Sequence, residues 1–212
     1  MSGVDRPGTT AGWAFDYDRT VALSDGVFAI ALTLLVLTIS FPELTGGAEH
    51  RLGTELGNRL PELFSYALSF AVLGYLWLRH HAFFRSLSRI DPVLAVLNLV
   101  YLAVVAFLPY PTRLLGVYGT DAVSVIVYSL TIVLVGTLSV LIRLHAERAG
   151  LTPPVSRESW GLQLTAPIVF LISVPIALAS PTAAKFSWLL LLVPRLRRRV
   201  KARSPADSST ES

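Results

Sequence analysis

The chain alternates between long apolar runs and short polar connectors. Six runs stand out: Arg19–Phe41, Pro61–Arg79, Pro92–Leu115, Ala122–Leu144, Trp160–Ser180 and Ala183–Val193. An α-helix needs about 20 mostly apolar residues to cross the hydrocarbon core of a bilayer. The first five runs reach that length, whereas Lys185 and Pro194 leave the sixth run short. The pattern predicts an all-α, polytopic membrane protein with six transmembrane helices, the sixth crossing by tilting or by snorkelling of Lys185.

The same pattern divides the chain into three parts. We expect a cytoplasmic N-terminal segment over residues 1–18, a six-helix transmembrane domain over residues 19–200 and a disordered cytoplasmic tail over residues 201–212. Asp91 precedes Pro92 and is a candidate N-cap for the third helix. Four prolines fall within later runs and predict kinks or early helix ends: Pro109, Pro111, Pro167 and Pro175.

Composition supports the membrane assignment and excludes several kinds of chemistry. Of the 212 residues, 53% are hydrophobic and only 15% are charged, whereas a soluble domain carries about 25% charged residues. The chain has no cysteine, which excludes disulfides, thiolate metal sites and cysteine nucleophiles. Too little polar sequence remains for a separate soluble domain.

Basic residues indicate how the helices are oriented. With the N-terminus in the cytoplasm, fourteen of the 18 Lys and Arg residues fall on the cytoplasmic side, and the other four are Arg51, Arg59, Arg113 and Lys185. This bias follows the positive-inside rule and requires an even number of spans, so both termini are expected in the cytoplasm. Six basic residues cluster near the C-terminus: Arg195, Arg197, Arg198, Arg199, Lys201 and Arg203. They are best explained as an orientation signal and an anchor to anionic lipid, not as a nucleic-acid site.

The first run has two different faces when it is placed on a helix at about 100° per residue. One apolar stripe is formed by Leu23, Ile30, Leu34, Leu37 and Phe41, with Gly26, Val27 and Thr33 at its edges. A stripe of this kind commonly contacts lipid or another helix, and lining a pore is the alternative.

Asp25 points to roughly the opposite side of the first helix from the apolar stripe. A carboxylate close to hydrocarbon is costly and needs a partner. Arg19 is six residues away, which is not a same-helix pairing distance, so Asp25 is expected to pair with another helix or another subunit. Either a structural role or a direct role in transport fits this position.

A second constellation ends the second run, where residues 77–84 read WLRHHAFF. His80 and His81 lie on the same side of the membrane as Asp25 and could supply its partner. Adjacent histidines point about 100° apart on a helix, so the pair is a poor metal site. Ser24 and Asp25 also point apart, and no glycine loop for an oxyanion is evident. We therefore expect neither an enzyme nor a metal or other cofactor.

Two motifs in this order resemble a known family. Residues 19–37, RTVALSDGVFAIALTLLVL, are similar to the RxxxFSDG signature of the prokaryotic relatives of the lysosomal potassium channel, and residues 77–84 are similar to their WxxHHxxF pattern. Leu23 stands where the signature has phenylalanine. The resemblance implies six-helix subunits without a TVGYG filter, a homotetramer whose first helices line a central pore, and K⁺ as the permeant ion in a bacterial plasma membrane.

The resemblance also implies roles for individual residues. Ile30 falls on the pore constriction, Leu34 and Leu37 on further apolar pore layers, and Thr33 on a hydroxyl position associated with cation selectivity. The remaining residues belong to a structural network on the cytoplasmic side: Arg19, Ser24 and Asp25, with His80 or His81 as their partners. An apolar constriction of this kind gates by dewetting.

Two other functions compete with a potassium channel. A proton-coupled transporter, or a proton-leak pathway, would use Asp25 with His80 or His81 as a relay. The sequence shows no inverted repeat of the kind many transporters have. A non-conducting membrane scaffold is the third reading. The expected partners are the lipid bilayer, K⁺ and further copies of the chain.

Overall fold

The computed structural model describes residues 17–40, 52–153 and 157–188, and these residues form helices and their connections. The elements are α1 (Tyr17–Leu34), the 3₁₀ turn η1 (Leu35–Thr38), α2 (Leu52–Asn58), α3 (Leu60–Phe84), α4 (Pro92–Phe107), α5 (Pro109–Val117), α6 (Ala122–Arg148), α7 (Arg157–Ala179) and α8 (Pro181–Ser187). The described part of the chain contains no strand, so the all-α prediction is confirmed.

Four helical segments are long and apolar enough to cross a membrane: Tyr17–Thr38, Leu60–Phe84, Pro92–Val117 and Ala122–Arg148. They coincide with the first four predicted runs. The fifth run corresponds to α7, in which the described side chains form the apolar stretch Leu164–Ala179. The sixth run begins inside α8, and its residues after 188 lie outside the described part of the chain, as do residues 1–16 and the predicted tail. Multiple spans are therefore confirmed, and the full count of six stays a prediction.

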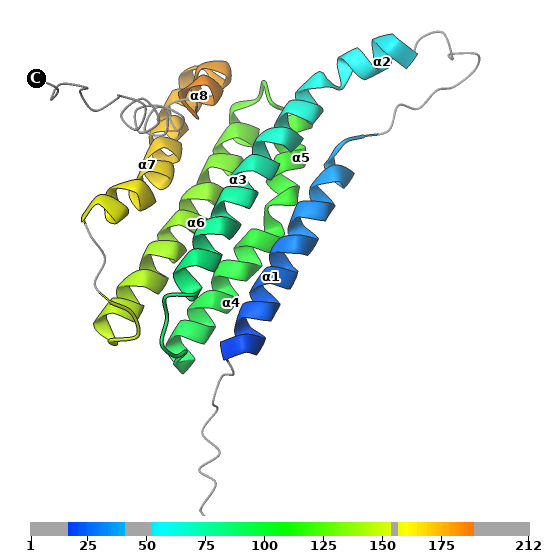
Figure 1. Cartoon of the computed structure of the whole chain (residues 1–212). Helices are drawn as coiled ribbons and strands as arrows, with labels where there is room; N and C mark the ends of the chain where they lie inside the picture. Colours follow the sequence, from blue (N-terminus) through cyan, green and yellow to red (C-terminus); the bar gives the residue numbers. More distant parts are fainter. Residues whose placement is uncertain (1–16, 41–51, 154–156, 189–212) are drawn as a thin grey trace, which may run out of the picture.

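The long helices lie side by side in one bundle (Figure 1). Helix α1 packs against α3 and α4, α4 packs against α6, and α7 and α8 cover the other side of α6. The Tyr17 end of α1 lies at the same end of the bundle as the connection between α3 and α4, where the Tyr17 hydroxyl donates to the carbonyl of Phe84 at 2.8 Å. One broad side of α1 is left exposed by the other described helices.

Side-chain caps and prolines mark several of the helix starts. The Asp91 carboxylate accepts a hydrogen bond from the Leu94 amide at 2.7 Å, which confirms the predicted N-cap. The third run is interrupted at Leu108, directly before Pro109, as expected where proline removes a helical hydrogen bond. Pro167 and Pro175 instead lie inside the continuous α7, so of the two predicted outcomes the early helix end does not occur there, and a kink stays a prediction.

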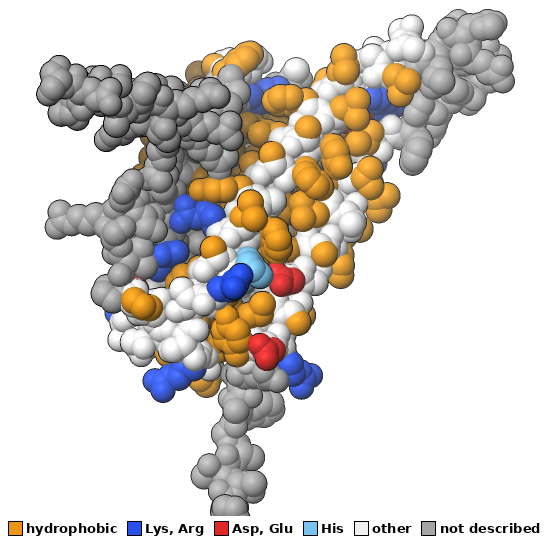
Figure 2. All heavy atoms as spheres, viewed as in Figure 1, with side chains coloured by type: hydrophobic (Ala, Val, Ile, Leu, Met, Phe, Trp, Pro, Cys, Tyr) orange, Lys and Arg blue, Asp and Glu red, His pale blue; other side chains and the backbone are white. Residues whose placement is uncertain are grey.

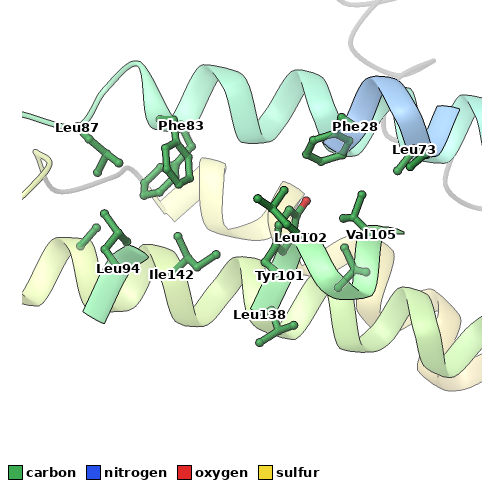
Figure 3. Close-up of a cluster of buried hydrophobic side chains, with 14 of the residues drawn as sticks. Phe28, Leu73, Phe83, Leu87, Leu94, Tyr101, Leu102, Val105, Leu138 and Ile142 are labelled. Atoms are coloured by element: carbon green, nitrogen blue, oxygen red, sulfur yellow. The ribbon is translucent and has the colours of Figure 1, made fainter. Parts of the chain in front are cut away.

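Two apolar clusters hold the bundle together. The first joins α1, α3, α4 and α6 around Phe28, Leu73, Tyr101 and Leu138 (Figure 3). The second joins α5, α6, α7 and α8 and is centred on Tyr128, Phe170 and Trp188. Only the first cluster contains residues of α1, so it is the one that positions the stripe predicted from the sequence.

Candidate pore surface and the contacts that position it

One face of α1 and η1 is buried inside the subunit. Its residues recur at alternating steps of four and three: Ser24, Phe28, Ala31, Leu35 and Thr38. This spacing keeps side chains on one side of a helix. The Phe28 ring contacts the rings of His80 and Tyr101, with centroids 5.5 and 6.1 Å away. Helix α1 is therefore fixed by α3 and α4 through this face.

The opposite face is open to the outside of the subunit, and it carries the predicted stripe. The exposed fractions are 49% for Leu23, 60% for Ile30, 41% for Leu34 and 65% for Leu37. Figure 2 shows a band of hydrophobic side chains over α1 and α3 on this side. The described part of the chain thus covers Ile30, Leu34 and Leu37 only partly. Their role at a pore stays a prediction.

Thr33 lies at the edge of this open face, as predicted. Its hydroxyl donates to the carbonyl of Ile30 at 2.8 Å. The residue also lines an open groove of about 490 Å³ between α1 and α3, together with Ala29, Leu32, Val36, Tyr66 and Phe70. Since its proton is committed to the helix backbone, the Thr33 oxygen has lone pairs to offer as an acceptor.

Ser24 belongs to a buried polar cluster that joins three helices. The Asn98 amide of α4 donates to the Ser24 hydroxyl at 3.0 Å, and the Ser24 hydroxyl donates to the carbonyl of Thr20 at 2.9 Å. His80 of α3 lies 2.9 Å from the Asn98 amide oxygen, which can only accept, so His80 donates from Nε2. The ring of His80 stacks on that of Phe84, with centroids 4.2 Å apart.

Asp25 belongs to a different and half-exposed cluster. Its carboxylate accepts from the Trp77 indole N–H at 2.8 Å. His81 Nδ1 lies 3.7 Å from the same carboxylate oxygen, which is close enough for an ion pair but too long for a hydrogen bond. The prediction that Asp25 has its partner on another helix is confirmed, and that partner is on α3.

The predicted five-residue network is therefore two clusters. Ser24 and His80 share the buried one, Asp25 and His81 share the half-exposed one, and the described contacts place the exposed Arg19 in neither. Adjacent side chains on a helix point about 100° apart. Ser24 and Asp25 on α1, like His80 and His81 on α3, therefore take part in separate sets of contacts.

Sequence reasoning missed the residues that complete these clusters. Asn98 is a lone amide within an otherwise apolar run, and that isolation could have marked it as a residue in need of a polar partner, although not which partner. Trp77 was considered as part of the 77–84 motif and not as a donor, although an indole N–H away from water usually finds an acceptor. Within the described ranges, no three His, Asp or Glu side chains come together as a metal site requires.

The fold, the several apolar helices and the open apolar face of α1 define a polytopic α-helical membrane protein. Residues 19–109 match the family described as the endosomal/lysosomal potassium channel TMEM175. A potassium channel of Streptomyces collinus is 36% identical over 182 residues, which cover 76% of this chain and 86% of that channel. This chain belongs to the TMEM175 family.

A solved structure and an animal relative extend the comparison. The crystal structure of a lysosomal potassium-selective channel TMEM175 homolog from Chamaesiphon minutus superposes with a TM-score of 0.74 at 27% identity, covering 85% of this chain and 97% of that one. The endosomal/lysosomal proton channel TMEM175 of Bos taurus is 38% identical over 98 residues, which cover 43% of this chain and 20% of that protein. These relatives are named as channels, not as enzymes.

Proposed function

We propose that the chain is one subunit of a potassium-permeable cation channel. The observation that carries this proposal is the apolar face of α1, where Ile30, Leu34 and Leu37 are 60%, 41% and 65% exposed on the subunit. The Streptomyces collinus relative is named a potassium channel and the Chamaesiphon minutus structure a potassium-selective one. Both names favour K⁺ as the permeant ion here.

In this proposal four copies assemble with their α1 helices around one axis. An apolar face that its own subunit leaves open needs lipid or protein cover. In a ring of four, the Ile30 stripe faces the axis and the groove beside Thr33 faces the neighbouring subunit. The groove is lined almost entirely by apolar side chains, which suits contact with a neighbouring helix.

The gate is then a set of apolar rings. Four Ile30 side chains at the axis leave a passage too narrow and too dry for a hydrated ion, and Leu34 and Leu37 add further apolar layers. Such constrictions conduct only when they become wet. Opening requires the α1 helices to rotate or to spread, so that water and K⁺ pass together.

Selectivity in this pore has a different origin from a carbonyl filter. The carbonyls of α1 are bonded within the helix, so they do not replace the hydration shell of the ion. The Thr33 hydroxyl oxygen is an acceptor at the edge of the stripe. Four such oxygens around an axis favour a modest preference for K⁺ over Na⁺.

We place the channel in the plasma membrane of a bacterial cell, with both termini in the cytoplasm. The distribution of the 18 basic residues supports this orientation. The Tyr17 end of α1 is then the cytoplasmic end, and no cofactor is needed for conduction.

A proton pathway is the second candidate function. The Asp25 carboxylate lies 3.7 Å from His81 Nδ1 with both side chains partly exposed, and the Bos taurus relative is named a proton channel. His80 Nε2 is bonded to Asn98, whereas His81 has the direct contact with Asp25, so the relay in this alternative runs through His81.

Recording from purified protein in a planar bilayer, with K⁺ on one side and Na⁺ on the other, tests the proposal. We expect discrete single-channel steps and a reversal potential shifted toward the K⁺ equilibrium. A pH gradient alone sets the reversal potential if protons are the permeant species. No current at all would favour the scaffold.

A further inference from the structure

The Thr38 end of α1 is held by a carboxylate of α3. Glu62 accepts from the backbone amide of Ser40 at 2.6 Å and from the Arg59 guanidinium at 2.9 Å. Ser40 follows the last residue of η1 by two positions. A side chain from the next long helix thus bonds the backbone at the point where the chain leaves α1.

Burial makes this contact a strong one. Glu62 is 5% exposed, and a buried carboxylate is costly unless charge-assisted hydrogen bonds compensate it. The Ser40 amide and the Arg59 guanidinium supply those bonds, and bonds to an ionised acceptor are about twice as strong as neutral ones. The carboxylate therefore ties two segments together with little freedom to move.

Helix α5 closes the third side of the contact. A Cβ added at Gly116 would lie 3.1 Å from the Glu62 Cα and 3.3 Å from its Cγ. These distances are shorter than ordinary van der Waals contacts, so only glycine lets α5 approach this closely. Glu62 is consequently wedged between η1 and α5.

Between its two ends, the described contacts of α1 with other helices are apolar ones, such as those of Phe28. At the Tyr17 end, polar bonds to other helices involve Tyr17, Ser24 and Asp25. Over residues 26–38, the side-chain hydrogen bonds among the described residues stay within the helix, from Thr33 to the carbonyl of Ile30 and from Thr38 to the carbonyl of Leu35. Leu37 lies three residues before Ser40, so its placement depends on how Ser40 is held.

We propose that Glu62 is a positioning residue for the pore helix: it fixes the rotation and height of η1, and with them the position of Leu37. The inference rests on the proposed function in one respect, namely that Leu37 lines the pore. The anchor itself is a property of the subunit and can be measured without ion flux.

The chain has no cysteine, so a single introduced cysteine is its only reactive thiol, and the modification rate refers to that position alone. Leu37→Cys and Leu23→Cys are made in the full chain and in its Glu62→Ala and Glu62→Gln variants. The purified, reconstituted protein is treated with a membrane-impermeant thiol reagent, and the rate of modification is measured. Glu55→Ala, which removes a carboxylate that belongs to α2, is the matched control.

We expect Glu62→Ala to change the modification rate of Leu37→Cys by about tenfold, the scale of losing a hydrogen bond to a charged group. Glu62→Gln keeps an acceptor for the Ser40 amide and is expected to change that rate less. Leu23→Cys, at the other end of α1, and the Glu55→Ala background are expected to keep their rates.

An unchanged rate at Leu37→Cys in Glu62→Ala overturns the proposal, and so does an equal change at Leu23→Cys, which indicates general loosening. Potassium current from the protein without these substitutions is recorded in parallel. If that current is missing, the proposed function fails while the thiol rates still decide the anchor. If it is present and the rates do not respond, only the anchor fails.

Discussion

The two faces of α1 carry similar apolar side chains in opposite surroundings. On one face Phe28 is 1% exposed and lies among the rings of α3 and α4, whereas on the other Ile30 is 60% exposed. The buried face also carries a polar bond between helices, from the Asn98 amide to the Ser24 hydroxyl. The contrast separates two tasks. One face packs against the other helices of the same chain, and the other face is available for contacts outside that chain.

The largest effect is expected from Phe28→Ala. A buried aromatic truncated to alanine costs about 3–5 kcal/mol, so the purified protein should unfold at a clearly lower temperature and assemble poorly. Leu37→Ala, on the open face, is the matched control and should leave subunit stability nearly unchanged. Thermal unfolding in detergent measures both, and equal losses would abolish the distinction between the two faces.

The next effect is expected from the buried cluster at Asn98. Asn98→Ala removes the amide that serves both Ser24 and His80, and leaving a buried polar group unpaired costs about 1–3 kcal/mol. Adding Ser24→Ala removes one of the stranded groups, so the double variant should be less destabilised than the sum of the single variants. Strictly additive losses would show that the three side chains do not act together.

A smaller effect is expected from Asp25→Ala. The substitution removes the bond from Trp77, but the carboxylate is 40% exposed, so the net loss is about 1 kcal/mol. We expect a reduced yield of assembled protein with unchanged ion preference, because Asp25 lies off the Ile30 stripe. Normal assembly with altered ion preference would place Asp25 in the permeation path.

The smallest effect concerns the contact of Asp91 with His145, which involves neither face of α1. Burial tends to raise the pKa of Asp91, but hydrogen bonds from the Leu94 amide and from His145, and the charge of Arg89, together lower it. A lowered pKa means that the contact stabilises the protein above the ordinary carboxyl range and that this stability is lost as the pH falls through the lowered value.

Unfolding temperatures at acidic pH test this contact. Asp91→Asn should abolish the part of the stability loss at low pH that comes from protonation of Asp91. The solvent accessibility of Ile30 should stay unchanged. An unchanged acid dependence in Asp91→Asn would show that other carboxylates account for the loss.

Helix periodicity was sufficient to predict that Ile30, Leu34 and Leu37 share one side of α1, because 100° per residue fixes which side chains share a side, but it did not identify the buried face around Phe28. It also separated His80 from His81. It could not predict the partners, because Asn98, Trp77 and Glu62 are chosen by the packing of whole helices against each other. The buried carboxylate at Glu62 in particular has no local signal, since Pro61 and Glu62 resemble an ordinary first turn.

The central claim is that the open face of α1 lines the ion pathway, and Ile30→Asn tests it most directly. An amide at the constriction should wet it, so K⁺ flux into liposomes should rise well above that of the unsubstituted protein. Leu130→Asn, at a position on α6 that is 48% exposed, should leave the flux unchanged. Equal flux from Ile30→Asn and the unsubstituted protein, at equal amounts of reconstituted protein, would contradict the account.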